Sequence, residues 1–268
     1  MAIPDGPIDL GFNPYESPLA ATRGQSSPFA VWRYRSGHDR AIWTMVLLSI
    51  TAVFSLAKMV LDVQQYQMLD NAKHGNFLSR SAAATHDDIF TLVGLTNGAM
   101  VLIIAIPFLM WTHRVYQNLG ALGATHLEHS PGWAVGWWFV PIANFIKPCT
   151  VMAEIWRHSV PERWGKFAPQ NVGANVYAQH SSGGIVLAWW CVYMFRVLVG
   201  AAVGAGSNIA MKQRDIDGVM TWTAVDVLFN IASIGAAALA ISMIWKIDAN
   251  QDARFESLQT ATPVAEPL

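Results

Sequence analysis

Four long apolar stretches constrain the fold of this chain more than any other feature. They occupy residues 41–61, 89–111, 184–206 and 219–245. Each is long enough for a helix that crosses a hydrocarbon layer of roughly 30 Å, which takes about 20 residues. The second stretch carries no charge, and the others carry one charged residue each: Lys58, Arg196 and Asp226. The sequence therefore predicts an all-α integral membrane protein with four transmembrane helices.

The composition supports a lipid bilayer as the main partner of the chain. Only 13% of the residues are charged, whereas a soluble domain has about 25%. The net charge of −1 gives no reason to expect binding to nucleic acid. Cys149 and Cys191 lie in apolar stretches at a spacing that fits no metal or redox motif. No nucleophile elbow, P-loop or dinucleotide fingerprint is present, so we expect no cofactor, no catalytic residues and no enzyme.

The segment 132–156 is apolar enough to resemble a fifth span. However, Pro141 and Pro148 each interrupt a helix, and Lys147 lies between them. The apolar run 132–146 is also short for a crossing and is typical of an interfacial or re-entrant element. We therefore predict four spans plus a Pro-broken, Trp-rich element, with five spans as the alternative.

The distribution of Lys and Arg favours four spans. Residues 1–38, 112–183 and 251–268 then lie on one side with the span ends beside them, and that side carries most of the basic residues, as cytoplasmic segments do. We expect 1–38 and 251–268 to be disordered cytoplasmic tails. Residues 39–250 form the membrane domain, in which 112–183 make a cytoplasmic platform.

The Trp-rich run 130–148, together with 113–123 and 154–157, resembles the signature of the domain-of-unknown-function family 4328. The resemblance covers roughly residues 40–250. It implies a bacterial inner-membrane protein and supplies no reaction. Because Asn144 and Lys147 stand between two prolines, we expect a broken helix that packs near Arg114 and Asn118. The residues predicted to face a partner or to form the motif are Arg114, Asn118, Trp133, Trp137, Trp138, Pro141, Asn144, Lys147, Pro148, Glu154 and Arg157.

Ionisable residues inside a span are costly and usually face a partner or a cavity. Arg196 and Asp226 lie at similar depths, so an ion pair between them is feasible. With Asn97 and Asn230 they predict an intramembrane polar cluster, which either fixes helix register or lines a solute or proton path. Lys58 is expected to extend to the interface or to pair with Asp62, one turn on. Separately, a GxxxG at 200–204 predicts close helix packing.

After Pro148 we predict a helix in the headgroup layer. Its apolar face holds Val151, Met152, Ile155 and Trp156, and its polar face holds Glu154, Arg157 and His158. Glu154 with His158, or His126 with His129, has a spacing that can hold a metal, but this spacing is common and no metal is expected.

These signals favour a regulatory, scaffolding or sensing role without catalysis, through a membrane or cytoplasmic protein partner. A small-solute transporter or channel is the alternative, and a metal-dependent membrane enzyme is the least favoured.

Overall fold

The structure is a computed structural model that describes residues 33–76, 79–124, 126–159 and 184–261. All regular elements in these residues are helical. Four are long: α2 (His38–Lys73), α3 (Arg80–Ala121), α7 (Gly184–Gln213) and α8 (Ile216–Ala261). Three are short: α4 (Pro131–Gly136), η2 (Ala143–Phe145) and α5 (Lys147–Ser159). The predicted all-α fold is confirmed.

The four long helices correspond to the four predicted spans, and each is long and apolar enough to cross a membrane. Their outward faces carry large apolar side chains, such as Leu95 and Leu102, which are 69% and 74% exposed. A surface of this kind suits lipid and would aggregate in water. The chain is therefore a membrane protein.

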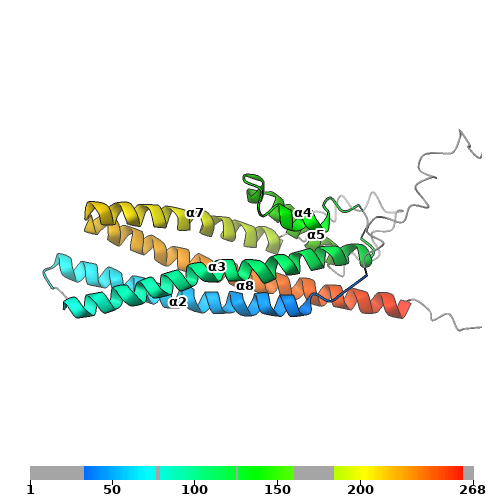
Figure 1. The fold of residues 1–268 in the computed structure, drawn as a ribbon, viewed down its shortest axis with the longest axis horizontal. Coiled ribbons are helices and arrows are strands. Elements are labelled where there is room, and N and C mark those ends of the chain that lie inside the picture. Colours follow the sequence, from blue (N-terminus) through cyan, green and yellow to red (C-terminus); the bar gives the residue numbers. More distant parts are fainter. Residues whose placement is uncertain (1–32, 77–78, 125, 160–183, 262–268) are drawn as a thin grey trace, which may run out of the picture.

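The long helices run side by side as two hairpins (Figure 1). α2 packs against α3 and α8, and α7 packs against α8. The α2–α3 and α7–α8 connections lie at one end, which we call the turn end. The short helices lie at the other, which we call the platform end, and both ends of the described chain are there. The main apolar core is also at the platform end, around Trp111, Tyr116, Met152 and Ile244.

The Trp-rich element does not cross the bundle. α4 gives way to turns around Pro141, a short 3-10 helix follows, and α5 begins at Lys147. Ile142 adopts a positive φ of 67°. A β-branched residue rarely has a positive φ outside an irregular turn. Ile142 and Phe139 are 81% and 71% exposed, so the turn presents an apolar tip. No fifth long apolar helix occurs in the described residues, and the tip suits an interfacial or re-entrant element.

The apolar face predicted for α5 is confirmed, because Val151, Met152 and Ile155 are fully buried. The predicted place of that face is wrong. These side chains belong to the main apolar core, against α3, α7 and α8, and not to a headgroup layer. Glu154 is also buried, contrary to its predicted place on the outer face.

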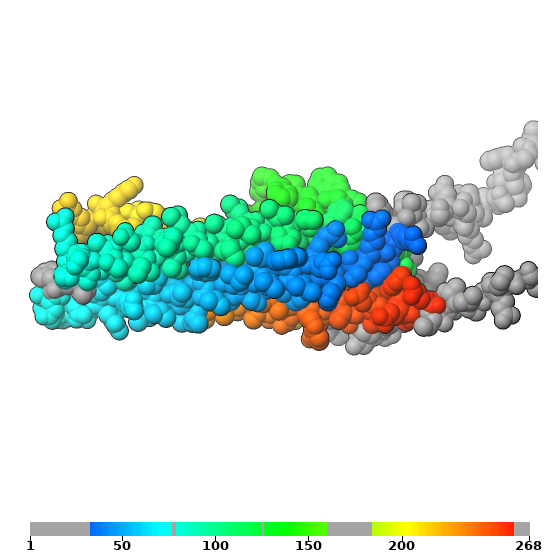
Figure 2. Space-filling model, turned by 60° about the horizontal axis from the view of Figure 1, so that its bottom comes forward, coloured from blue at the N-terminus to red at the C-terminus, as the bar shows by residue number. Residues whose placement is uncertain are grey.

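The tails are shorter than predicted. α8 continues through residues 251–261, so the disorder predicted there is wrong. Residues 33–38 are also ordered: Tyr34 stacks on Phe255 with 4.2 Å between ring centroids. Figure 2 shows the first described residues against the end of α8. Residues 1–32 and 262–268, with the remaining tail predictions, lie outside the described residues, as do 160–183 of the predicted platform.

The close approach of α7 and α8 uses a different glycine from the one expected. Gly200 faces Phe229, which would lie 2.8 Å from an added Cβ. Gly204 faces open space, whereas Gly206 lies directly against Trp222. The GxxxG prediction is therefore right for its first glycine and wrong for its second.

Candidate functional site

The buried face of α2 is almost entirely polar. Spacings of three, four and seven residues place these side chains on one side of the helix, and the side facing lipid is apolar. Two polar side chains of α8 bond this stripe, Asp226 to Lys58 and Asn230 to Asp62, and Thr223 is buried one turn before Asp226. We call the combined set the polar seam; it comprises Thr51, Ser55, Lys58 and Asp62 of α2 with Thr223, Asp226 and Asn230 of α8.

Lys58 is the centre of the polar seam. Its ammonium group donates hydrogen bonds to Asp62, one turn on, and to Asp226 across the helix pair at 2.7 Å. Asn230 donates to the other oxygen of Asp62 at 3.0 Å. The ring of Phe90 covers the ammonium group, with its centroid 3.7 Å away. One cation therefore faces two carboxylates, which leaves a formal charge of −1 inside the bundle.

This arrangement corrects two predictions. Asp226 pairs with Lys58, so the predicted Arg196–Asp226 ion pair is wrong. Lys58 is 7% exposed and does not extend to the interface, although its predicted pairing with Asp62 is confirmed. Asn97 forms no hydrogen bond to the seam, and its buried carbonyl oxygen has no partner among the described residues.

Arg196 lies in a different environment, on the α7–α8 side. Its Nε donates to the hydroxyl of Ser233 at 3.0 Å. Its guanidinium lies over the ring of Phe229, 5.5 Å from the centroid. No carboxylate of the described chain forms an ion pair with it. The guanidinium therefore has donors to spare.

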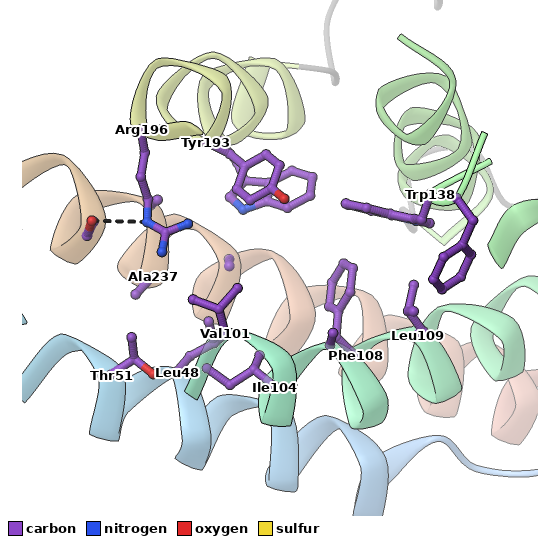
Figure 3. Close-up of a pocket in the computed structure, with 16 residues that line it drawn as sticks. Leu48, Thr51, Val101, Ile104, Phe108, Leu109, Trp138, Tyr193, Arg196 and Ala237 are labelled. Carbon is purple, nitrogen blue, oxygen red and sulfur yellow. Dashed lines mark hydrogen bonds between the residues drawn. The ribbon is translucent and has the colours of Figure 1, made fainter. Parts of the chain in front are cut away.

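Arg196 borders a pocket of about 260 Å³ between α3 and α7, with α2 and α8 as its floor (Figure 3). Small residues of α8, Ala236, Ala237 and Ala240, leave this space open. Four lining residues carry polar groups: Thr51, Tyr193, Arg196 and Ser233. The rest of the lining is made of aliphatic residues, Phe and Trp. An apolar pocket with few polar groups is the usual form of a small-molecule site.

The Trp-rich element forms one wall of this pocket. Trp138 and Phe139 line it together with Phe108 of α3 and Trp189 of α7. Trp138 meets Phe108 edge to face at 5.4 Å between centroids, a favourable aromatic geometry. The pocket thus joins the transmembrane helices to the element that precedes α5.

Glu154 holds the platform together from its buried position on α5. Its carboxylate accepts a hydrogen bond from the backbone N–H of Glu128 at 2.6 Å. Its other oxygen lies 2.7 Å from the hydroxyl of Tyr116. The backbone N–H of His129 donates to that hydroxyl at 3.0 Å. Glu154 therefore fixes the loop before α4.

Asn118 belongs to a second buried network at the platform end. Its side-chain amide donates to the carbonyl of Arg35 at 3.0 Å and to Gln251 at 3.2 Å. Gln251 in turn donates to Val115 and Ser159, each at 3.1 Å. The network joins residues 33–37, α3, α5 and α8. The sequence reasoning missed Gln251 because it placed this residue in a tail.

A clasp of side chains holds residues 33–38 on α8. The hydroxyl of Tyr34 donates to Asp252, and His38 Nδ1 lies 2.8 Å from the carboxylate of Asp248. Burial and the hydrogen bond to Asp252 raise the pKa of Tyr34, so its hydroxyl stays a donor at neutral pH. His38, Asp248 and Asp252 offer three ligand atoms within 4.8 Å of one another and form the one such group among the described residues. Sequence spacing could not reveal it, because His38 is remote in the chain.

The other predicted motif residues have separate roles. Arg114 lines a second pocket together with Gly132 and Val135 of α4, and α4 packs on α3, as expected for a Trp-rich element near the end of the second span. Trp133 and Trp137 pack at 4.6 Å between centroids, and Lys147 lies over the ring of Trp137. The remaining members of the predicted set do not join the pocket: Asn144 has a buried oxygen without a partner among the described residues, and Arg157 bonds its own helix.

Cys149 supports the packing interpretation. Burial raises the pKa of its thiol, so near neutral pH it remains protonated and packs as an apolar side chain.

Comparison with known proteins gives one match. The family model "Domain of unknown function (DUF4328)" matches residues 74–249, which run from the α2–α3 turn to one residue beyond Asp248 of the clasp. No curated protein and no solved structure matches the chain. Lys58 and Asp62 of the polar seam fall outside the matched residues, whereas Arg196 and the Trp-rich wall fall inside. The chain therefore belongs to the DUF4328 family, as its Trp-rich signature indicated.

Proposed function

We propose that this chain is a membrane sensor without catalytic activity, which takes a small apolar molecule from the bilayer into the pocket between α3 and α7. The observation that carries the proposal is the wall formed by Trp138 and Phe139. A molecule in the pocket touches transmembrane helices and the Trp-rich element at once. A bound molecule therefore changes the position of the Trp-rich element in the platform, and a protein partner that binds the platform responds to that change.

The pocket is accessible from the side of the bundle. Val101 and Phe139 both line it and are both well exposed at the surface of the chain. In a bilayer that surface is covered by acyl chains, so an apolar molecule reaches the pocket without passing through water. This route favours a lipid-soluble ligand over a polar solute.

The proposed location is a bacterial plasma membrane with both termini and the platform in the cytoplasm. The excess of Lys and Arg on the platform side supports this orientation. The position of both ends of the described chain at the platform end supports one shared side for the two termini (Figure 1).

Mass spectrometry of protein purified in mild detergent tests the proposal. Ala237→Trp fills the pocket, and Ala238→Trp places the same ring on the exposed side of α8 as a matched control. We expect the parent and Ala238→Trp to retain an apolar molecule that Ala237→Trp does not retain. We also expect slower hydrogen exchange in 131–146 when the molecule is present. Equal retention by all three proteins, or unchanged exchange, would contradict the proposal.

A transporter or channel is the second candidate, and the polar seam favours it. Lys58, Asp62 and Asp226 place ionisable groups within the bundle, as proton and ion paths do. Flux in proteoliposomes distinguishes the two functions. If Asp226→Asn abolishes a solute or proton flux that Asp217→Asn leaves intact, the chain transports. Asp217 is a suitable control because it pairs with Lys73 at the exposed turn end.

A further inference from the structure

Arg196 lies near the middle of the third span, and most of its N–H donors have no partner among the described residues. It lies twelve residues from the start of α7, which corresponds to roughly 18 Å along the helix. A hydrocarbon layer is roughly 30 Å thick. At this depth water does not compensate the charge, yet the described residues supply only the Ser233 hydroxyl and the face of Phe229.

The side chain is directed toward the pocket. Figure 3 shows the guanidinium reaching over Ala237, with Tyr193 beside it and Phe108 and Trp138 farther along. A cation in an apolar space needs an anion, and a guanidinium binds a carboxylate through two parallel hydrogen bonds. The charge and the planar fork of Arg196 therefore specify the head group that the pocket takes.

The size of the pocket specifies the tail. Its volume is about 260 Å³, which exceeds that of an apolar cavity of roughly 150 Å³ that binds benzene. A single short alkyl chain suits this space, whereas a two-chain lipid would leave its second chain outside the pocket. The aromatic wall of Phe108, Trp138 and Trp189 offers apolar contact along the whole chain.

We propose that the pocket binds a medium-chain fatty acid, with its carboxylate on Arg196 and its tail along the aromatic wall toward the platform. The proposal rests on the sensing function above and names the ligand of that pocket. A phospholipid is a poorer fit, because its phosphate stays at the bilayer surface, roughly 15 Å from the midplane. A fatty acid reaches the depth of Arg196 in its neutral form, and its binding as the anion releases one proton to the bulk solution.

The test measures binding of radiolabelled decanoic acid to the detergent-solubilised full chain, with unlabelled decanol as the neutral match in competition. We expect the acid to bind at least about tenfold more tightly than the alcohol, since a hydrogen-bonded charge pair is worth at least that factor. Arg196→Gln should remove this difference, and Arg196→Lys should keep part of it. Arg80→Gln, which changes an exposed arginine at the turn end, should leave it intact.

The outcomes separate this inference from the proposed function. Equal binding of acid and alcohol would overturn the fatty-acid assignment and leave a sensor for neutral molecules. Failure of both ligands to bind, as when a second copy or a partner helix fills the pocket, would overturn both. Tighter binding of decyl phosphate than of decanoic acid would replace the carboxylate with a phosphate. If Arg196→Gln elutes as an aggregate in gel filtration, the acid-to-alcohol ratio of the parent decides alone.

Discussion

Removing Lys58 should destabilise the bundle far more than removing either of its partners. Lys58→Met keeps the length of the side chain but leaves the carboxylates of Asp62 and Asp226 without a cation. Loss of one partner from a buried ion pair costs about 3–5 kcal/mol. Asp62 is fully buried, so it should contribute most of that cost, whereas the Asp226 side chain is 18% exposed. The loss of stability has an upper limit, because a carboxylate left without a cation can take up a proton and become neutral.

Asp226→Asn provides the comparison. Its amide oxygen still accepts from Lys58, and Lys58 and Asp62 remain as a neutral pair. We expect a loss of about 1 kcal/mol or less, the usual scale of a membrane hydrogen bond. The double variant Lys58→Met/Asp62→Asn should recover stability relative to Lys58→Met, because it removes the most deeply stranded charge.

Steric trapping or unfolding in mixed micelles gives these free energies of unfolding. Equal losses for Lys58→Met and Asp226→Asn would refute the view that Lys58 neutralises both carboxylates. So would a double variant that is no more stable than Lys58→Met.

Three further predictions concern packing, the clasp and topology. Gly206→Ala should destabilise the protein by about 1–3 kcal/mol, because its Cβ would meet Trp222, while Gly204→Ala should be near neutral in the same melts. Because the pKa of Tyr34 is raised on folding, its contribution to stability is complete below the unfolded value of about 10 and declines above it. The mobility of a nitroxide label at position 36, measured by electron paramagnetic resonance, should therefore rise above that pH in the parent, and in Tyr34→Phe it should be high at all pH values. His74→Ala, at the turn end, is the control, and it should not change the mobility of residues 33–37. A cysteine introduced at Gln170 should react with a membrane-impermeant maleimide only from the platform side, and labelling from the opposite side would require a fifth crossing.

The sequence was sufficient to predict the spans, because a window of twenty apolar residues has few alternatives to a membrane helix. The prolines were sufficient to show that 132–146 is broken. Pairings between helices were harder to predict. The depths of Arg196 and Asp226 made them plausible partners, but helix rotation turns Asp226 toward α2 and Arg196 toward Ser233.

One available signal for the polar seam was missed. Thr51, Ser55 and Lys58 recur at helical spacing within the first span, and Asp62 continues the series just after it, which indicates a polar face that lipid cannot accept. The pocket, in contrast, depends on how far apart α3 and α7 stand, and spacing along the chain contains no such information. The clasp could not be predicted either, because α8 was expected to end before Gln251 and residues 33–38 were expected to belong to a disordered tail.

The length of α8 has a mechanical consequence. Its 46 residues form one helix without a proline, about 69 Å from end to end. This one helix therefore holds four side chains at fixed positions relative to one another: Asp226, Ser233, Asp248 and Gln251. A rotation of α8 at Ser233 is therefore transmitted to the C-terminal end of the helix, and residues 33–37, which contact that end, move with it.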